Sequence, residues 1–181
     1  MAKFNDSASN GIALRVWQDR AGPGGDAWEI GRLRQIERME AGQVMVVVDP
    51  GNGPEAVMIG NPIGQEPGST DVVADVFHPL VDLENCALGS WYLNVLGTAP
   101  ARRRQGHAQR LMAVAEAIAR AGGHVEITII VADSNAPARA LYAATGYVER
   151  ARRPMVKDGH GAGIPGENWL LLAKPLAPAS T

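Results

Sequence analysis

The chain has 181 residues, 46% of them hydrophobic and 20% charged, with a formal net charge of −2. This length and balance predict a single globular domain over 1–181, and the small net charge gives no sign of nucleic-acid binding. The longest aliphatic run, Val44–Val48, is far shorter than the roughly 20 apolar residues that cross a bilayer. Because the first residues also lack the apolar core of a secretory signal, we expect a soluble cytoplasmic protein without a membrane partner.

The first half of the chain is predicted to mix helices and strands. Residues 1–10 are expected to form a flexible polar lead, and residues 12–16 are expected to form a short strand. Apolar side chains in 27–41 fall near helical spacing and predict a helix. Residues 43–48 form a β-branched run and predict a strand, and a second strand is predicted at 55–59 after a Gly/Pro turn cluster, so together they predict a hairpin.

A long segment, residues 60–89, then separates two strands and is rich in Gly, Pro and acidic residues. A short helix is expected around 80–87. Loops of this length are uncommon in compact domains and often functional, while a tolerated surface insertion is the alternative.

The second half alternates strands and helices more clearly. Gly106 precedes an amphipathic helix that Gly122 ends, and Ser134 or Asn135 caps a second helix that runs to about Ala144. Strands are predicted at 91–96, 125–131, 147–148 and 169–172, and the tail 175–181 is expected to be flexible. This order predicts a mixed α/β sheet flanked by helices.

Charge is distributed unevenly. The stretch 39–101 holds eight acids and no Lys or Arg, whereas 102–181 holds eleven Lys/Arg against six acids. Two explanations are equally possible. The charges are unevenly spread over the surface without a function, or an acidic face for a cationic substrate lies beside a basic face for an anionic cofactor.

The segment Arg102–Ala108 follows a strand and opens a helix. A helix N-terminus offers unpaired backbone amides and the positive end of the helix dipole, and Gly106 and Ala108 allow a phosphate to approach closely. The segment therefore predicts a diphosphate cradle, against the alternative of an exposed basic helix start that serves solubility. It is neither a dinucleotide-binding nor a Walker motif, because the required glycine and Gly-Lys-Ser/Thr patterns are absent.

Over roughly 90–150 the chain resembles the GNAT N-acetyltransferase superfamily. Arg103-Arg104-Gln105-Gly106-His107-Ala108 fits its R/Q-x-x-G-x-G/A motif, with His107 as a spacer whose ring is expected to point outward. Asn135, Ala138, Leu141, Tyr142 and Gly146 fall at the spacing of the family's second motif. The resemblance implies a mostly antiparallel central sheet and acetyl-CoA as co-substrate, without a metal.

The resemblance also implies roles for individual residues. The backbone of Leu96-Gly97-Thr98 would pair with the pantetheine arm, and an amide near Leu96 would polarise the thioester carbonyl. Amides from Arg103 to Ala108 would hold the pyrophosphate. Asn135 and Ala138 would contact the cofactor.

Tyr142 would protonate the departing thiolate of CoA. A phenol with a pKa of about 10 is a suitable donor to an alkyl thiolate of about 8.5, and a helix N-terminus can lower the phenol's pKa. The alternative is an aromatic residue that only packs in the core. The general base is less defined, since the strand position that carries a glutamate in some members is Tyr92 here. The candidates are Glu84 and a water relayed through Tyr92, Asn94 or backbone carbonyls.

The remaining reactive side chains carry less signal. Cys86 is the only cysteine, which excludes an intrachain disulfide and a thiolate zinc site, and it is expected to be a buried structural thiol. The four histidines lack metal-ligand spacing. The tryptophans are expected in the core, although Trp17 or Trp28 is a candidate wall of the acceptor pocket.

Three functional classes follow from the sequence. They are an N-acetyltransferase acting on a small-molecule or peptide amine, a non-catalytic CoA-binding module on the same fold, and, least favoured, a nucleotide-binding Rossmann enzyme. A homodimer is compatible with the first two. The acid-only stretch favours a cationic acceptor, with Asp82 and Glu84 as its expected contacts.

Overall fold

The computed structural model describes residues 12–177. Six strands form a sheet in the order β1-β2-β3-β4-β6-β5. Strands β3 and β4 run parallel, while β1 with β2, β4 with β6 and β5 with β6 run antiparallel. The predicted mixed, mostly antiparallel sheet with helices is therefore confirmed. The chain clusters into two compact units, one holding the chain up to Asn61 and Asn94–Ala113, the other Pro62–Leu93 and the chain from Val114 onward.

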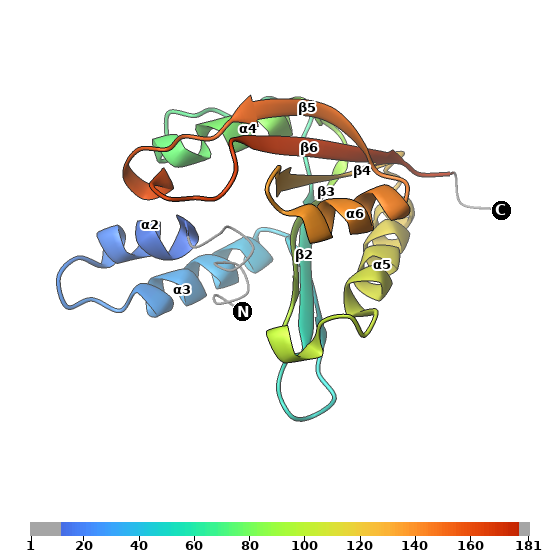
Figure 1. The fold of residues 1–181 in the computed structure, drawn as a ribbon, viewed down its shortest axis with the longest axis horizontal. Coiled ribbons are helices and arrows are strands. Elements are labelled where there is room, and N and C mark those ends of the chain that lie inside the picture. The colour runs from blue at the N-terminus through green and yellow to red at the C-terminus, as the bar shows by residue number, and fades with distance from the viewer. Residues whose placement is uncertain (1–11, 178–181) are drawn as a thin grey trace. The chain divides into compact units, whose positions relative to one another are not determined.

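In the first unit, helices α2 (Ile12–Ala21) and α3 (Ala27–Glu40) lie side by side (Figure 1). The strand predicted at 12–16 is wrong, because these residues form the first turns of α2. Its buried side chains, Ile12, Ala13, Val16 and Trp17, fall at helical spacing, and five residues are too few to separate this spacing from a strand pattern. A Cβ at Gly31 of α3 would lie 2.6 Å from the ring of Trp17, so glycine permits this close approach.

The predicted hairpin is confirmed in the same unit. Strands β1 (Val44–Val48) and β2 (Ala56–Pro62) pair antiparallel, with Val46 opposite Met58. Buried Val57, Ile59 and Val95 pack together with Met45 to form a core cluster. Strand β3 (Trp91–Thr98) contributes its carboxyl-terminal half to this unit.

In the second unit, α4 (His78–Asn85) packs against β5 (Val148–Pro154) and β6 (Asn168–Pro175), as Figure 1 shows. Strand β4 (Glu126–Ala132) pairs with β6, and α6 (Ala136–Ala144) follows it. Three short 3-10 helices complete the described chain: η1 (Asp75–Phe77), η2 (Pro100–Arg102) and η3 (Gly159–Gly161). The helix α5 (His107–Ala121), whose residues up to Ala113 belong to the first unit, buries the predicted apolar stripe, which includes Leu111, Met112, Ala115 and Ala119.

The long segment 60–89 is held by hydrogen bonds along its length. Within the second unit, the Asn85 side chain binds both backbone groups of Gly68, at 2.8 and 3.0 Å. The amide of Ile63 donates to Ser90 O at 2.9 Å, and that of Gly89 donates to Ile63 O at 3.2 Å. The helix predicted around 80–87 is confirmed as α4.

The carboxyl-terminal segment is ordered further than the sequence predicts. Strand β6 continues to Pro175, and the amide of Leu176 donates to Val125 O at 2.8 Å. Leu176 is also buried, with 6% of its surface exposed. Apolar burial of Leu176 therefore extends the fold past the predicted end, while the rest of the predicted tail and the lead 1–10 lie outside the described residues.

Candidate functional site

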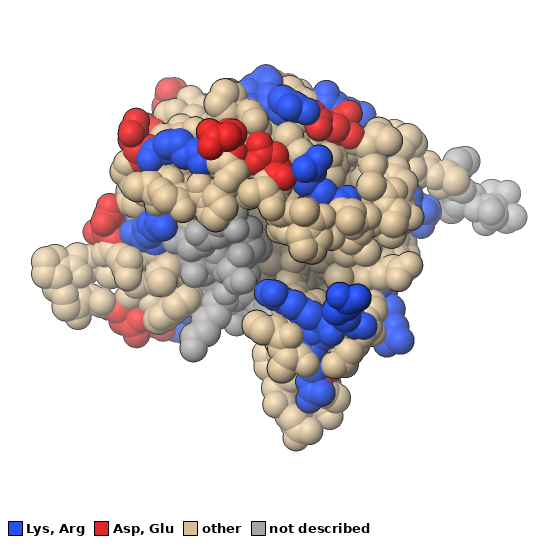
Figure 2. All heavy atoms as spheres, in the orientation of Figure 1, with Lys and Arg blue, Asp and Glu red and all other residues tan. Residues whose placement is uncertain are grey.

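The predicted phosphate-binding segment forms an open loop between η2 and α5. Among the described residues, Arg104 is the only non-glycine residue with a positive φ, at 65°, and Gly106 follows with a φ of 81°. A Cβ built on Gly106 would meet no atom within 4 Å, so the space in front of its backbone is open. Basic side chains gather over this part of the chain (Figure 2). A strained backbone beside an open face is typical of a binding loop.

The structure changes the set of amides that a phosphate can use. The Arg103 amide donates to Pro100 O at 3.4 Å, where it ends η2. The Arg110 amide donates to Gly106 O at 3.1 Å and starts the hydrogen-bond ladder of α5. The amides that remain for an anion are therefore those between these two points, at Arg104, Gln105, Gly106, His107 and Ala108 in the predicted segment.

His107 does not point outward as predicted. Its side chain is only 11% exposed, and its Nε2 lies 3.4 Å from a carboxylate oxygen of Glu55. The other Glu55 oxygen lies 2.8 Å from Nε of Arg102. Sequence reasoning missed Glu55, because the pairing of β2 with β3 and the backbone contact between Glu55 and Ala99, which together bring the hairpin to this loop, leave no local signal in the sequence.

The end of β3 lies in the same unit as the loop. Strand β3 pairs with β4 at Trp91 and Tyr92, and this register does not extend to Leu96. Leu96, Gly97 and Thr98 are half-buried residues. The arrangement fits the predicted backbone pairing with an extended ligand, which stays a prediction.

The second motif builds α6 in the second unit. The side chain of Asn135 caps this helix by accepting from the Ala138 amide at 3.3 Å, and Pro137 lies in the first turn. This confirms the predicted cap. The cap also occupies the Asn135 oxygen and the Ala138 amide, so a contact of Asn135 with a cofactor would use its side-chain NH₂ group.

Tyr142 lies in the last turns of α6 and is 5% exposed, with its ring centroid 6.0 Å from that of Tyr147. Burial raises the pKa of its phenol above the ordinary value of 10. The expectation that a helix N-terminus lowers this pKa is therefore wrong. The phenol stays protonated at neutral pH, as a proton donor must, and its role as the acid stays a prediction beside the packing role.

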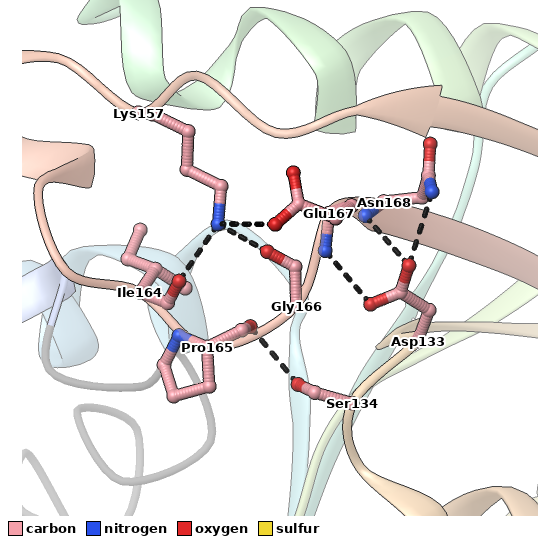
Figure 3. A network of polar contacts seen from close by, with 8 residues as sticks. All are labelled: Asp133, Ser134, Lys157, Ile164, Pro165, Gly166, Glu167 and Asn168. Atoms are coloured by element: carbon pink, nitrogen blue, oxygen red, sulfur yellow. Dashed lines mark hydrogen bonds and ion pairs between the residues drawn. The ribbon is translucent and has the colours of Figure 1, made fainter.

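A polar network ties the connection between β5 and β6 to the end of β4 (Figure 3). The Asp133 carboxylate accepts from the amides of Glu167 and Asn168, at 3.0 and 2.9 Å, and from the Asn168 side chain at 3.0 Å. Ser134 Oγ donates to Pro165 O at 2.9 Å. These contacts fix the junction from which α6, with Asn135 and Tyr142, begins.

The same connection is braced from its other side by Lys157 (Figure 3). Its Nζ donates to the carbonyl oxygens of Ile164 and Gly166 and approaches Glu167. Sequence reasoning did not identify Asp133 or Lys157, since most of their partners are backbone carbonyls and amides, which carry no residue-type signal.

The candidate base remains a choice between two predictions. Glu84 is a half-buried residue of α4, and Tyr92 is buried in β3. Asp82, predicted to contact a cationic acceptor, lies 3.7 Å from Nε of Arg153. At least two acids of the stretch 39–101, Glu55 and Asp82, lie 2.8 and 3.7 Å from an arginine nitrogen, which reduces the negative field of this stretch.

Cys86 is exposed, so the expectation of a buried structural thiol is wrong. It is the residue that follows the last turn of α4, and its Sγ donates to Asp82 O at 3.3 Å. A guanidinium nitrogen of Arg153 lies 3.9 Å from the sulfur. The expectation of a buried thiol rested on residue type alone, whereas the position of Cys86 at the end of α4 places its side chain at the surface.

The tryptophans, candidate metal ligands and candidate membrane spans were also considered in the sequence. Trp17, Trp91 and Trp169 are buried, as expected, and Trp28 is half-buried, with its ring centroid 6.1 Å from that of Trp17 in an edge-type arrangement. Within residues 12–177 no three His, Cys, Asp or Glu side chains gather as metal ligands. In that same range no helix is long and apolar enough to cross a membrane.

The comparisons with known proteins agree on one fold. Solved structures with a similar fold include a mosquito arylalkylamine N-acetyltransferase like 5b, with a TM-score of 0.64, 16% identity and coverage of 84% of this chain and 82% of that chain. A GNAT family acetyltransferase from Elizabethkingia anophelis with acetyl-CoA bound has a TM-score of 0.55, 14% identity and coverage of 79% and 82%. The ribosomal-protein-S18-alanine N-acetyltransferase from Escherichia coli has a TM-score of 0.52, 19% identity and coverage of 95% and 92%.

Sequence comparison identifies the family. No curated protein matches the chain in sequence. The family model for the acetyltransferase (GNAT) family matches residues 56–147, just over half of the chain. The matched range contains the open loop after η2 and the whole of α6. The chain therefore belongs to the GNAT acetyltransferase family.

Proposed function

We propose that this protein is an acetyl-CoA-dependent N-acetyltransferase that moves the acetyl group to a primary amine by direct attack in a ternary complex. The observation that carries the proposal is the loop before α5, with left-handed Arg104 and Gly106 and an open face. Consecutive amides in such a turn, at the positive end of a helix dipole, suit a diphosphate. The Elizabethkingia neighbour holds acetyl-CoA, which supports this choice of ligand.

The proposed binding mode uses two parts of the chain. Amides from Arg104 to Ala108 would hold the pyrophosphate, and the backbone of Leu96–Thr98 would pair with the pantetheine arm. The Leu96 amide would donate to the thioester oxygen, where negative charge develops during attack. Arg102 is paired with Glu55, and the positive charge of Arg103 would attract the phosphates from solution.

The reaction would form one C–N bond and break one C–S bond. The unprotonated amine attacks the thioester carbon, and the departing thiolate takes a proton from the phenol of Tyr142. The amine loses its proton to Glu84 or to water relayed along Tyr92 and Asn94. Acid assistance of this kind contributes about 10²–10⁴ to a rate.

Ligand binding is tested first, by thermal shift with acetyl-CoA, CoA, NAD and ATP. A ligand at 100 times its Kd stabilises the folded state by about 2.7 kcal/mol. For a chain of this size that is a shift of about 5–11 °C. We expect it for acetyl-CoA and CoA and not for NAD.

The location is tested with Gly106→Val. Valine at a φ of 81° would distort the loop and place a branched side chain where the phosphate approaches. Gly123→Val is the matched control, because Gly123 has a φ of 77° and equally open surroundings but follows the other end of α5. Loss of CoA binding in Gly106→Val alone supports the proposal, and unchanged binding in folded Gly106→Val contradicts it.

Catalysis is tested by an amine screen that measures CoA release. The mosquito enzyme's name refers to arylalkylamines and the Escherichia coli enzyme's name to an alanine of a ribosomal protein, so the panel includes arylalkylamines and peptides with a free N-terminus. Turnover on an amine supports the enzyme. Tight CoA binding without turnover on any amine would favour the non-catalytic CoA-binding module.

A further inference from the structure

We propose that Glu55 is a positioning residue that keeps the phosphate-binding loop in its observed conformation. It does so by contacting the residues at both ends of the loop, Arg102 and His107. This inference rests on the proposed function, and it concerns a residue just outside the range that the family model matches. Glu55 immediately precedes β2 and is separated from the loop by about fifty residues of sequence.

The backbone of Glu55 is fixed first. Its amide donates to Val48 O at 2.8 Å and closes the β1–β2 hairpin. Its carbonyl accepts from the Ala99 amide at 2.8 Å, one residue before η2. Because both backbone groups are bonded, the side chain starts from a defined point beside the loop.

One carboxylate then spans the loop. Oε1 lies 2.8 Å from Nε of Arg102, the last residue of η2, and Oε2 lies 3.4 Å from Nε2 of His107, the first residue of α5. The side chains of Glu55 and His107 are only 14% and 11% exposed, so water screens this contact poorly. The Glu55 carboxylate therefore contacts the residues on both sides of the four-residue loop 103–106.

The loop needs such support because its backbone is strained. A non-glycine residue in the left-handed region, as Arg104 is, persists only when its surroundings determine it. His107 Nε2 is also buried and has no aligned hydrogen-bond partner among the described residues, so the Glu55 carboxylate is the charged group that it faces. Without the carboxylate, this ring has no anion to face and Arg102 is released.

The sign of the effect separates positioning from simple charge. A carboxylate near an anion site repels the phosphates, so its removal would tighten CoA binding if Glu55 acted only through its charge. If Glu55 holds the loop open, removal weakens binding of any ligand that uses the loop. A ligand without phosphates would then be unaffected.

The experiment compares Glu55→Gln with wild type by titration calorimetry and steady-state kinetics. We expect CoA affinity to fall about tenfold, equivalent to about 1.4 kcal/mol. The KM for acetyl-CoA should rise by a similar factor with kcat within twofold, and the KM for S-acetylpantetheine, which lacks the diphosphate, should change less than twofold. Glu29→Gln is the matched control, because Glu29 pairs with Arg32 at 2.6 Å on the exposed face of α3.

The outcomes are distinct. If wild type binds CoA and folded Glu55→Gln binds it equally or more tightly, the Glu55 inference is overturned and the proposed function stands. If Glu55→Gln weakens CoA and S-acetylpantetheine alike, the loop is not what Glu55 holds, and the inference is also overturned. If wild type fails to bind CoA at all, the proposed function fails and the inference fails with it.

A second variant covers the case in which Glu55→Gln does not fold. His107→Gln removes the ring from the other end of the contact and leaves Glu55 paired with Arg102. We expect it to weaken CoA binding about fivefold, with S-acetylpantetheine unchanged. Wild-type CoA affinity in folded His107→Gln would overturn the inference.

Discussion

Asp133→Ala is expected to destabilise the second unit by removing the anchor between β4 and the β5–β6 connection. The carboxylate accepts from the amides of Glu167 and Asn168 and from the Asn168 side chain, all at 2.9–3.0 Å (Figure 3). A Cβ at Gly166 would lie 2.3 Å from Oδ1, which shows how closely the connection packs on this carboxylate. Alanine leaves all three N–H donors without their acceptor.

The size of the effect follows from the bonds lost. Hydrogen bonds contribute about 1 kcal/mol each, and those to a charged group about 1.5–3 kcal/mol when well buried. Asp133 is half-buried, so we take the lower figure for each of the three bonds from Glu167 and Asn168 and expect a loss of about 3 kcal/mol. In a chain of this size each kcal/mol lowers Tm by about 2–4 °C, which gives a fall of about 6–12 °C.

The difference should depend on pH in a defined direction. Burial by itself would raise the pKa of Asp133, but the hydrogen bonds from Asn168, Glu167 and Ser134 outweigh it and lower the pKa below the ordinary value of 3.8. Because the folded-state pKa is the lower one, the stabilisation is complete above the unfolded-state pKa and is lost as pH falls through the folded value. The gap between wild type and variant should therefore be constant from about pH 5.5 to 8 and shrink below about pH 4.

The assay is urea unfolding followed by tryptophan fluorescence, since buried Trp169 lies next to Asn168 in β6. Asp158→Ala is the matched control, because Asp158 is an exposed aspartate of the same connection whose side chain caps no helix. We expect less than about 0.5 kcal/mol from it. Equal stabilities of the two variants, or a gap that widens in acid, would refute the reasoning.

Three further predictions concern chemistry. Tyr142→Phe should lower kcat by about 10²–10⁴ with little change in the KM for acetyl-CoA, and full turnover in the variant would remove Tyr142 from the mechanism. Since burial raises the pKa of the phenol, wild-type kcat should show no ionisation of Tyr142 between about pH 6 and 9. Cationic acceptors should be preferred at low salt and less so at high salt or in Glu84→Gln, and a best acceptor that is anionic, or indifferent to both changes, would contradict this. Cys86 should react with Ellman's reagent in the native protein, because it is exposed beside Arg153, and Cys86→Ser should abolish that reaction while acetyl transfer persists.

Elements that depend on neighbouring residues were predictable from the sequence. Helix α6 begins at its Asn135 cap with Pro137 in the first turn, and Gly146 follows its end with a φ of 91°. The hairpin of β1 and β2 follows from two predicted strands around a turn. These signals are local because capping, turn conformation and helical or strand periodicity act over a few residues. Helix α2 was not predicted, because the five residues 12–16 on which the strand prediction rested do not span two helical turns.

The family motifs and the order of the elements around the loop before α5 can be read from the sequence. The inward turn of His107, the exposure of Cys86 and the long-range partners of Glu55 and Asp133 depend on how the chain packs. Glu55 meets Arg102 across about fifty residues, and Asp133 meets Asn168 across 35 residues. Such partners are set by strand register and by where each chain reversal returns, and no spacing within a local segment encodes that return.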